Sequence, residues 1–224
     1  MPRILPTRVW KALRWEFLIK ARMLLQQFSP RFHLKLWNLR KRTDLKLNLG
    51  CFYAGKEEGW INVDAIPTPC VDFVWDLRIP SPLREGSVQY IFCEHMFEHL
   101  DYHEEALPFL KDCFRLLRSG GILRIVVPDA EKFCKVYSSN DWNEAEKLRG
   151  KDCVQTLMEL VNDVFRQSGE HQFAYDEETL RMKLTEAGFT GILRSRYGES
   201  KVTGLAIDKE WCSIESLYME AMKP

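Results

Sequence analysis

The chain has 224 residues and no net charge, and 46% of its residues are hydrophobic. This length and composition suit one well-buried domain with an extension, and the neutral total excludes the global basic field typical of nucleic-acid binding. The neutrality hides an asymmetry, because residues 1–44 hold 11 Lys and Arg against 2 Asp and Glu, whereas the remainder holds 21 against 30. A basic segment before an acidic domain indicates a membrane or polyanion partner.

Apolar residues recur at spacings of three and four from Thr7 to Phe28, which predicts one amphipathic helix that ends at Ser29-Pro30. A second basic and aromatic stretch follows from Arg31 to Arg42. Two interpretations stay open. The helices pack on the domain or on a sister subunit, or they form a basic amphipathic anchor on an anionic bilayer surface. We therefore expect an extension over residues 1–44, with possible peripheral membrane contact through residues 1–42.

From residue 45 onward, strand-like and helix-like patterns alternate, which predicts an α/β fold with a doubly wound sheet over residues 45–224. The expected strands are Leu45–Leu49, Trp60–Asp64, Val71–Trp75, Val88–Cys93, Ile122–Val127, Phe189–Arg196 and Ser213–Lys223. The expected helices are Asp101–Leu117, a helical region from Asp129 to about Gln167, and Glu178–Ala187.

The chain has seven cysteines, an odd number, and no two are spaced as C-x-x-C. This pattern predicts reduced, buried thiols in a cytoplasmic protein and not a disulfide or zinc framework. No run of about 18 apolar residues exists, and the N-terminus lacks the pattern of a signal peptide. We expect a cytoplasmic location, possibly peripheral at the inner face of the membrane.

The stretch Leu45–Asp64 combines a strand, a glycine turn and a second strand that ends on an acid. This is the layout of a nucleotide-type site, in which Gly50 lets the backbone approach the ligand and Asp64 can accept ribose hydroxyls. A dinucleotide fingerprint is absent because Phe52 stands where its second glycine would be. A phosphate loop is disfavoured because Glu57 replaces its hydroxyl residue.

The segments Leu47–Cys51 (LNLGC) and Gly59–Asp64 (GWINVD) resemble the first two motifs of class I SAM-dependent methyltransferases, in a branch similar to methyltransferase type 11. Further motifs follow in order at Val71–Arg78, Val88–His99 and Leu117–Asp129. The resemblance implies a Rossmann-like sheet of seven strands, whose last strand is antiparallel, and S-adenosyl-L-methionine as cofactor.

The resemblance also implies a role for each strand end. Backbone at Gly50 and Cys51 would face the methionine part of the cofactor, and Asp64 would hold the ribose. Asp76 would accept from the adenine amino group, with Leu77 against the ring. The expected cofactor-binding residues are Leu49, Gly50, Cys51, Asp64, Asp76, Leu77, Cys93 and Glu94.

His95, His99 and His103 recur at four-residue spacings, which would put them on one helical face with Glu98 beside them. The pattern is not H-E-x-x-H, because Met96 stands where the glutamate is needed. It is similar to an E-x-x-E-H metal triad of some methyltransferases, with His95 in place of the first glutamate. Since Glu-His-Leu at this point is also common in metal-free methyltransferases, we favour a structural or substrate-facing role and expect no metal.

Methyl transfer needs mainly alignment of the reacting atoms, but an oxygen acceptor also needs a general base. Histidine is the side chain best suited to that task near neutral pH. His95, after the fourth strand, is the first candidate for a catalytic residue, and His171 is the second.

These observations predict a SAM-dependent methyltransferase that acts, through oxygen, on a small-molecule or glycan-like acceptor, possibly at the membrane surface, with no nucleic-acid partner. A different class of protein stays open as the alternative. It is a non-catalytic SAM-binding protein, or a cofactor-free scaffold in which Phe52 narrows the pocket and the basic extension is the functional part.

Overall fold

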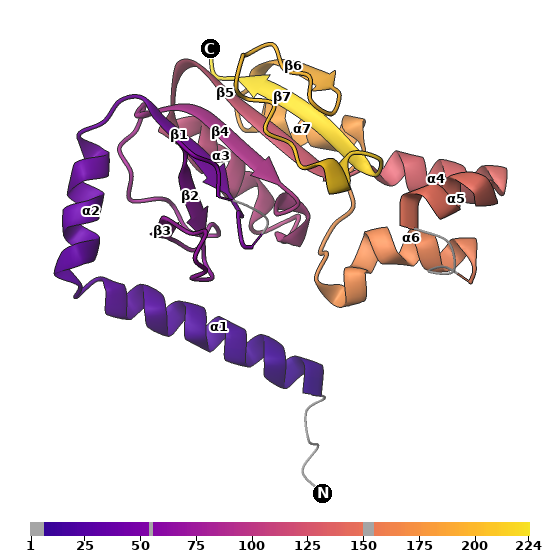
Figure 1. Cartoon of the computed structure of the whole chain (residues 1–224), viewed down its shortest axis with the longest axis horizontal. Coiled ribbons are helices and arrows are strands. Elements are labelled where there is room, and N and C mark those ends of the chain that lie inside the picture. The colour runs from indigo at the N-terminus through magenta and orange to yellow at the C-terminus, as the bar shows by residue number, and fades with distance from the viewer. Residues whose placement is uncertain (1–6, 54–55, 150–154) are drawn as a thin grey trace, which may run out of the picture.

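The computed structural model describes residues 7–53, 56–149 and 155–224. The predicted thiol of Cys153 and part of the glycine loop, residues 54–55, lie outside the described residues. Within the described part, two N-terminal helices precede a sheet of seven strands that carries the remaining helices (Figure 1). The helices are α1 (Thr7–Gln26), α2 (Pro30–Arg40), α3 (Ala106–Leu116), α4 (Ala130–Ser139), α5 (Trp142–Arg149), α6 (Leu157–Arg166) and α7 (Glu177–Glu186).

The sheet has the strand order β3-β2-β1-β4-β5-β7-β6. Strands β1 to β5 pair with one another in parallel, and β7 is antiparallel to both β5 and β6. The expected Rossmann-like sheet with an antiparallel last strand is therefore confirmed. The strands are β1 (Leu45–Leu49), β2 (Ile61–Asp64), β3 (Phe73–Val74), β4 (Val88–Glu94), β5 (Leu117–Pro128), β6 (Thr190–Ser195) and β7 (Ser216–Met222).

The strand order reverses between β1 and β4, where Leu49 pairs with Cys93. In an open parallel sheet, ligands bind beyond the carboxyl ends of the strands at such a reversal. Alternate residues of β5 face opposite sides of the sheet: Ile125 and Val127 belong to the main core, whereas Val126 belongs to a second cluster with Trp60 and Leu205. Over these residues β5 is therefore apolar on both faces, as expected for a strand buried in the middle of a sheet.

Some predicted boundaries differ from the observed ones. The helix expected from Asp101 begins only at Ala106, because the carboxylate of Asp101 accepts hydrogen bonds from the backbone of the turn that follows it. Strand β5 begins directly after α3 at Leu117, which pairs with Val88, so no loop separates the two elements. Strand β7 begins at Ser216 and not at Ser213, because a 3₁₀ turn, η3 (Glu210–Cys212), precedes it.

Helix α2 packs on the sheet edge. Its N-cap is Ser29, which accepts a hydrogen bond from the Phe32 amide. The Phe32 ring stacks on Phe73 and Trp75, with centroids 5.5 and 6.4 Å apart, and Leu39 is buried in the main core. For this second helix, the interpretation of packing on the domain fits the structure.

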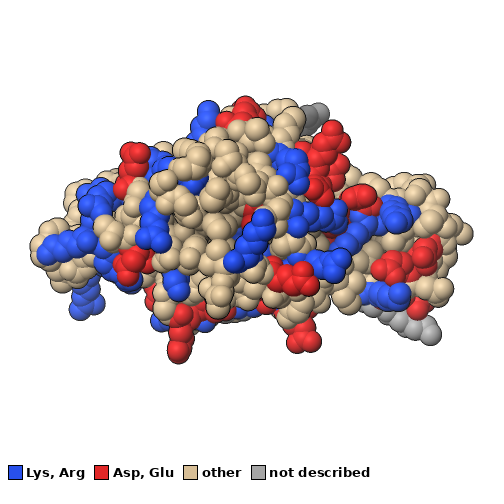
Figure 2. Space-filling view, turned by 90° about the horizontal axis from the view of Figure 1, so that it is seen from above, with Lys and Arg blue, Asp and Glu red and all other residues tan. Residues whose placement is uncertain are grey.

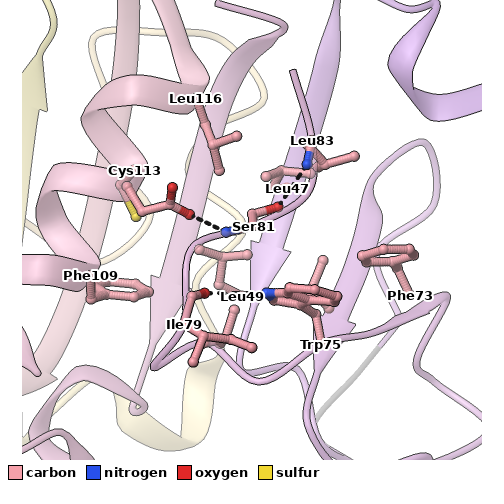
Figure 3. A pocket seen from close by; sticks show the side chains of 13 residues that line it. Leu47, Leu49, Phe73, Trp75, Ile79, Ser81, Leu83, Phe109, Cys113 and Leu116 are labelled. Carbon is pink, nitrogen blue, oxygen red and sulfur yellow. Dashed lines mark hydrogen bonds between the residues drawn. The ribbon is translucent and has the colours of Figure 1, made fainter. Parts of the chain in front are cut away.

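A small hollow lies inside the domain between the sheet and α3 (Figure 3). Its volume is about 20 Å³ and its walls are almost entirely apolar. The two polar residues on its wall, Ser81 and Asp112, are bonded to each other through the Ser81 amide at 2.8 Å. A space of this size holds at most about one water molecule, so it is a packing defect of the core and not a ligand site.

The cysteines in the described part of the chain are free thiols, as predicted, but they are not uniformly buried. Cys51, Cys93, Cys113 and Cys212 are buried, whereas Cys134 is exposed. Burial raises the pKa of the Cys51 thiol to about 12, so this residue is a neutral core side chain at physiological pH.

Candidate functional site

A pocket of about 230 Å³ lies beyond the carboxyl ends of β1 and β2, and α1 runs along its outer side (Figure 1). Residues from strand ends, from the turn after β4 and from α1 meet here, although they are far apart in the sequence. The lining residues are Glu16, Ile19, Gly50, Asp64, Ala65, Asp76, Leu77, Arg78, Met96, His99 and Leu100.

Gly50 forms the floor of this pocket at the end of β1. Its φ of +76° lies in the left-handed region, which side chains other than glycine rarely adopt. A Cβ built at this position would lie 2.5 Å from Cβ and Cγ of Met96. Both the backbone conformation and the space therefore require glycine here.

Asp64, at the end of β2, presents a nearly buried carboxylate to the pocket. Its Oδ2 accepts a hydrogen bond from the Phe52 amide at 2.9 Å, and its Oδ1 accepts from the Ile66 amide at 2.8 Å. Burial raises the pKa of Asp64, although these amide donors oppose the shift. Each carboxylate oxygen keeps lone-pair capacity after one such bond, so the group can accept two neighbouring hydroxyls of a sugar.

Asp76 lies on the same pocket wall and is held by Arg78. Asp76 Oδ1 accepts from the amide and Nε of Arg78 at 3.0 and 2.9 Å, and Oδ2 accepts from Nη2 at 2.8 Å. Burial acts to raise the pKa of Asp76, but the hydrogen bonds and charge of Arg78 outweigh it and lower the pKa. Arg78 also donates to both carboxylate oxygens of Glu16 on α1, so one guanidinium joins the sheet edge to the N-terminal helix.

Phe52 follows this loop and does not line the pocket. Its side chain is 45% exposed, and its ring meets Tyr53 edge-on at 4.5 Å between centroids. The ring therefore does not narrow the pocket, which removes the reason for expecting a cofactor-free scaffold. Phe52 does adopt a positive φ of 35°, a conformation that is sterically favourable for glycine and unfavourable for residues with a Cβ.

Comparison with known proteins adds to this geometry. Residues 69–125 match a family profile described as a methyltransferase domain, and no curated protein matches the chain. This match covers a central part of the chain, and the sheet has the strand order of the class I methyltransferase fold. Both findings support a SAM-dependent methyltransferase with S-adenosyl-L-methionine as its cofactor.

Solved structures share the fold at low sequence identity. A 1,6-didemethyltoxoflavin-N1-methyltransferase from Burkholderia thailandensis, solved with 1,6-didemethyltoxoflavin and S-adenosylhomocysteine, is 16% identical over 100% of this chain and 92% of that chain, with a TM-score of 0.50. A SAM-dependent methyltransferase from Archaeoglobus fulgidus is 17% identical over 91% and 99% of the two chains, with a TM-score of 0.49. A possible histamine N-methyltransferase from Thermotoga maritima is 16% identical over 96% of each chain, with a TM-score of 0.46.

Only half of the residues expected to bind the cofactor line this pocket. Gly50, Asp64, Asp76 and Leu77 do so. The other four lie in or beside the core: Leu49, Cys51 and Cys93 are buried among strand residues, and Glu94 accepts a hydrogen bond from the Lys209 amide at 3.0 Å. The role of all eight residues in binding stays a prediction.

Among the pocket residues that sequence reasoning missed, two are charged, Glu16 and Arg78. Arg78 follows the strand-end acid Asp76 directly, and its ability to pair with that acid was a local signal. Glu16 is the only acidic residue of α1, and nothing in the sequence indicates its partner across the chain.

The prediction that His95, His99 and His103 share one helical face is wrong. Residues 97–99 form a single 3₁₀ turn, η1 (Phe97–His99), and a turn follows over residues 102–105 before α3 begins. His95 has a φ of +48°, which is incompatible with a continuing helix. His103 is exposed on that later turn.

The two histidines predicted to be catalytic are bonded within the protein. His95 Nε2 lies 2.8 Å from Ser216 Oγ, and its Nδ1 lies 3.3 Å from Glu98 Oε1. Burial lowers the pKa of His95, but the nearby Glu98 outweighs it and raises the pKa. His171 is buried, and its Nδ1 lies 2.7 Å from the Val164 carbonyl oxygen. Neither histidine lines the pocket, and both catalytic roles stay predictions.

Among the described residues, none of the helices combines the length and the apolar character that a bilayer-spanning segment needs. Helix α1 and the turn that follows it nevertheless carry exposed apolar side chains: Phe17, Leu24, Leu25 and Phe28 are 58–78% exposed. Contact between this helix and the rest of the chain involves Glu16, Ile19 and the buried Met23.

Proposed function

We propose that this chain methylates an oxygen atom of a small-molecule or glycan-like acceptor. The observation that supports the proposal best is the shared pocket of Gly50, Asp64 and Asp76 at the strand ends. When bound, S-adenosyl-L-methionine would supply an activated methyl group: the acceptor oxygen would bond to the methyl carbon as the carbon–sulfur bond breaks with its electron pair on sulfur, and the acceptor's proton would pass to a general base or to water.

The residues of the chain bind and orient the reactants. Gly50 lets the backbone come close to the ligand. The carboxylate of Asp64 accepts hydrogen bonds from ligand hydroxyls, while two backbone amides hold this carboxylate in place. The carboxylate of Asp76 already accepts three hydrogen bonds from Arg78. Fewer lone pairs therefore remain to accept a hydrogen bond from an adenine amino group than on an unpaired carboxylate. Such alignment supplies most of the rate acceleration in a transfer of this kind.

Binding of S-adenosylhomocysteine tests the proposal. In calorimetric titrations of the full chain, the wild type should release heat, and Asp64→Asn should bind at least about tenfold more weakly, because one hydrogen bond to a charged group contributes about 1.5–3 kcal/mol. Asp44→Asn is the matched control, since Asp44 is exposed and lies before β1. No heat from the wild type, or equal affinity in the Asp64 variant, would contradict the proposed site.

We further infer that the N-terminal extension, residues 1–44, contacts an anionic membrane surface. Phe17 and Leu24 of helix α1 and Phe28 in the turn after it are exposed, and Lys20 and Arg22 of the helix are exposed as well. Basic residues of α2 add to this charge, and Figure 2 shows blue side chains at the end of the molecule where Figure 1 places α2. An apolar stripe with flanking cations is the pattern of helices that lie in a bilayer interface.

Sedimentation with vesicles tests this inference. The full chain should sediment with phosphatidylserine-containing vesicles and much less with neutral phosphatidylcholine vesicles, because the basic residues need anionic lipid. The double variant Phe17→Ser with Phe28→Ser should lose most of this binding. Replacement of Met158 and Met182 by Ser is the matched control, because both are exposed apolar residues outside the extension. Equal sedimentation of all three proteins would exclude the membrane contact.

A further inference from the structure

Glu98 is a buried carboxylate whose charge the described hydrogen bonds do not balance. Its side chain is 1% exposed, and among the residues that the structure describes neither carboxylate oxygen receives a hydrogen bond. The Nδ1 atom of His95, 3.3 Å from Oε1, is within ion-pair distance. Because burial of a carboxylate without donors is costly, such a group usually has a partner, a proton or a cation.

Two imidazoles face this carboxylate, and backbone carbonyls fix their tautomers. His99 Nδ1 lies 3.1 Å from the Glu170 carbonyl oxygen, and His171 Nδ1 lies 2.7 Å from the Val164 carbonyl oxygen. A carbonyl oxygen only accepts, so each Nδ1 carries the proton, and in the neutral ring Nε2 then carries the lone pair. This arrangement is typical of histidines that bind a metal ion.

The three side chains are also close enough to share one ion. One ligand atom each from Glu98, His99 and His171 lie within 4.8 Å of one another. His171 Nε2 is 3.9 Å from Glu98 Oε1, and the two rings meet edge-on with centroids 5.0 Å apart. Ligand atoms about 2.0–2.2 Å from a tetrahedral Zn²⁺ lie roughly 3.5 Å apart, so small side-chain rotations would complete the site.

The backbone holds the two parts of this cluster together. The amides of Gln172 and Phe173 both donate to the Glu98 carbonyl oxygen, at 2.8 and 3.3 Å. The turn after β4 and the segment that follows α6 are therefore joined independently of any side chain. A site that the backbone preorganises in this way loses less entropy when it binds an ion.

We propose that Glu98, His99 and His171 bind one divalent transition-metal ion. Two imidazoles and one carboxylate suit Zn²⁺, Mn²⁺ or Fe²⁺, whereas Ca²⁺ and Mg²⁺ prefer oxygen ligands alone. His95 lies outside the ligand set and positions Glu98 through its Nδ1. The sequence alone favours no metal, because Glu-His-Leu after the fourth strand is also common in metal-free methyltransferases. The spacing of residues 95–103 also gives no hint that His171 lies beside this cluster.

The position of the cluster suggests what the ion would do. His99 belongs both to the cluster and to the wall of the cofactor pocket. Three protein ligands leave at least one coordination position for water or for another oxygen ligand. The ion would thus bind an acceptor through oxygen beside the reacting methyl group, an inference that rests on the proposed function.

Metal binding by the full chain tests the proposal directly. After removal of metal with a chelator, calorimetric titration with Zn²⁺ and with Mn²⁺ should show one site per chain for at least one of them. His99→Asn and His171→Asn should each weaken that binding by at least about 10–100-fold, the loss known even for outer-shell partners of a metal. His103→Asn is the matched control, because His103 is an exposed imidazole close in sequence but outside the cluster.

Further measurements separate the alternatives. Circular dichroism checks that each variant is folded, and His99 is less buried than His171, so its replacement disturbs the core less. Titration with Co²⁺ should give no thiolate charge-transfer band, which excludes a site at the exposed Cys134. Absence of binding, or equal binding in all variants, would overturn the metal site. S-adenosylhomocysteine binding by the metal-free protein distinguishes this failure from failure of the proposed cofactor site.

Discussion

The two sides of the pocket proposed for the cofactor are built in different ways. On the sheet side, Gly50 is fixed by its backbone, and the carboxylate of Asp64 is fixed by two backbone amides. On the outer side, α1 contributes Glu16 and Ile19, and Arg78 is the side chain that bonds Glu16 to the sheet edge. Backbone-fixed groups lose little entropy when a ligand arrives, whereas a helix held by an exposed ion pair can move at little cost.

This difference indicates that the two sides of the pocket have different functions. The sheet side should determine whether the cofactor binds at all, and the α1 side should determine how fast it enters and leaves. If the proposed membrane contact of α1 is also correct, the same helix has one face on the pocket and an apolar face toward the lipid. Changes on the two sides of the pocket should then differ in kind as well as in size.

The largest effect is expected at Gly50. Gly50→Ala introduces a left-handed non-glycine residue and a Cβ 2.5 Å from the Met96 side chain, so it should lower the free energy of unfolding by about 2–3 kcal/mol and abolish binding of S-adenosylhomocysteine. Urea denaturation and calorimetry measure the two results.

Gly59→Ala is the matched control for this change. Gly59 has a similar φ of +79°, but a Cβ there would meet no atom within 4 Å. Gly59→Ala should therefore lower the free energy of unfolding only by the conformational strain, about 1–2 kcal/mol, and leave the affinity for S-adenosylhomocysteine unchanged. Equal losses in the two variants would show that the contact with Met96 is unimportant.

A smaller effect is expected on the α1 side. Glu16→Gln weakens the ion pair with Arg78 and should raise the dissociation rate of S-adenosylhomocysteine by roughly 2–5-fold, because a half-exposed ion pair contributes at most about 1 kcal/mol. Stopped-flow fluorescence, which Trp75 near the pocket residue Leu77 makes feasible, measures this rate.

Lys20→Gln is the control for the Glu16 variant, since Lys20 is exposed and its nitrogen lies 3.8 Å from Glu16. It should leave the dissociation rate unchanged, because Arg78 still joins Glu16 to the sheet. A Glu16 variant with a wild-type rate would argue against α1 as the moving side of the pocket.

The sequence was sufficient for the sheet side and insufficient for the outer side. Strand patterns and a glycine turn are local features, so Gly50, Asp64 and Asp76 could be placed at strand ends without coordinates. The pairing of Glu16 with Arg78, and that of Glu98 with His171, joins residues far apart in the chain. Periodicity also misled at His95–His103, because a positive φ at His95 and a 3₁₀ turn replace the expected helix.

The smallest effect is expected at Phe52, although it is the residue that departs most visibly from the methyltransferase motif. Its ring is half exposed and does not line the pocket, but its φ of +35° is unfavourable for a residue with a Cβ. Phe52→Gly removes that strain, about 1–2 kcal/mol, and adds about 0.5–1 kcal/mol of unfolded-state entropy, so stability should change by less than about 1 kcal/mol.

Phe52→Ala keeps the strain and removes the ring, and it separates the two contributions. Calorimetry with S-adenosylhomocysteine should give equal affinities for both variants and the wild type. A clear gain in affinity in both would mean that the ring reaches the cofactor after all, and that the loop after β1 belongs to the movable side of the pocket.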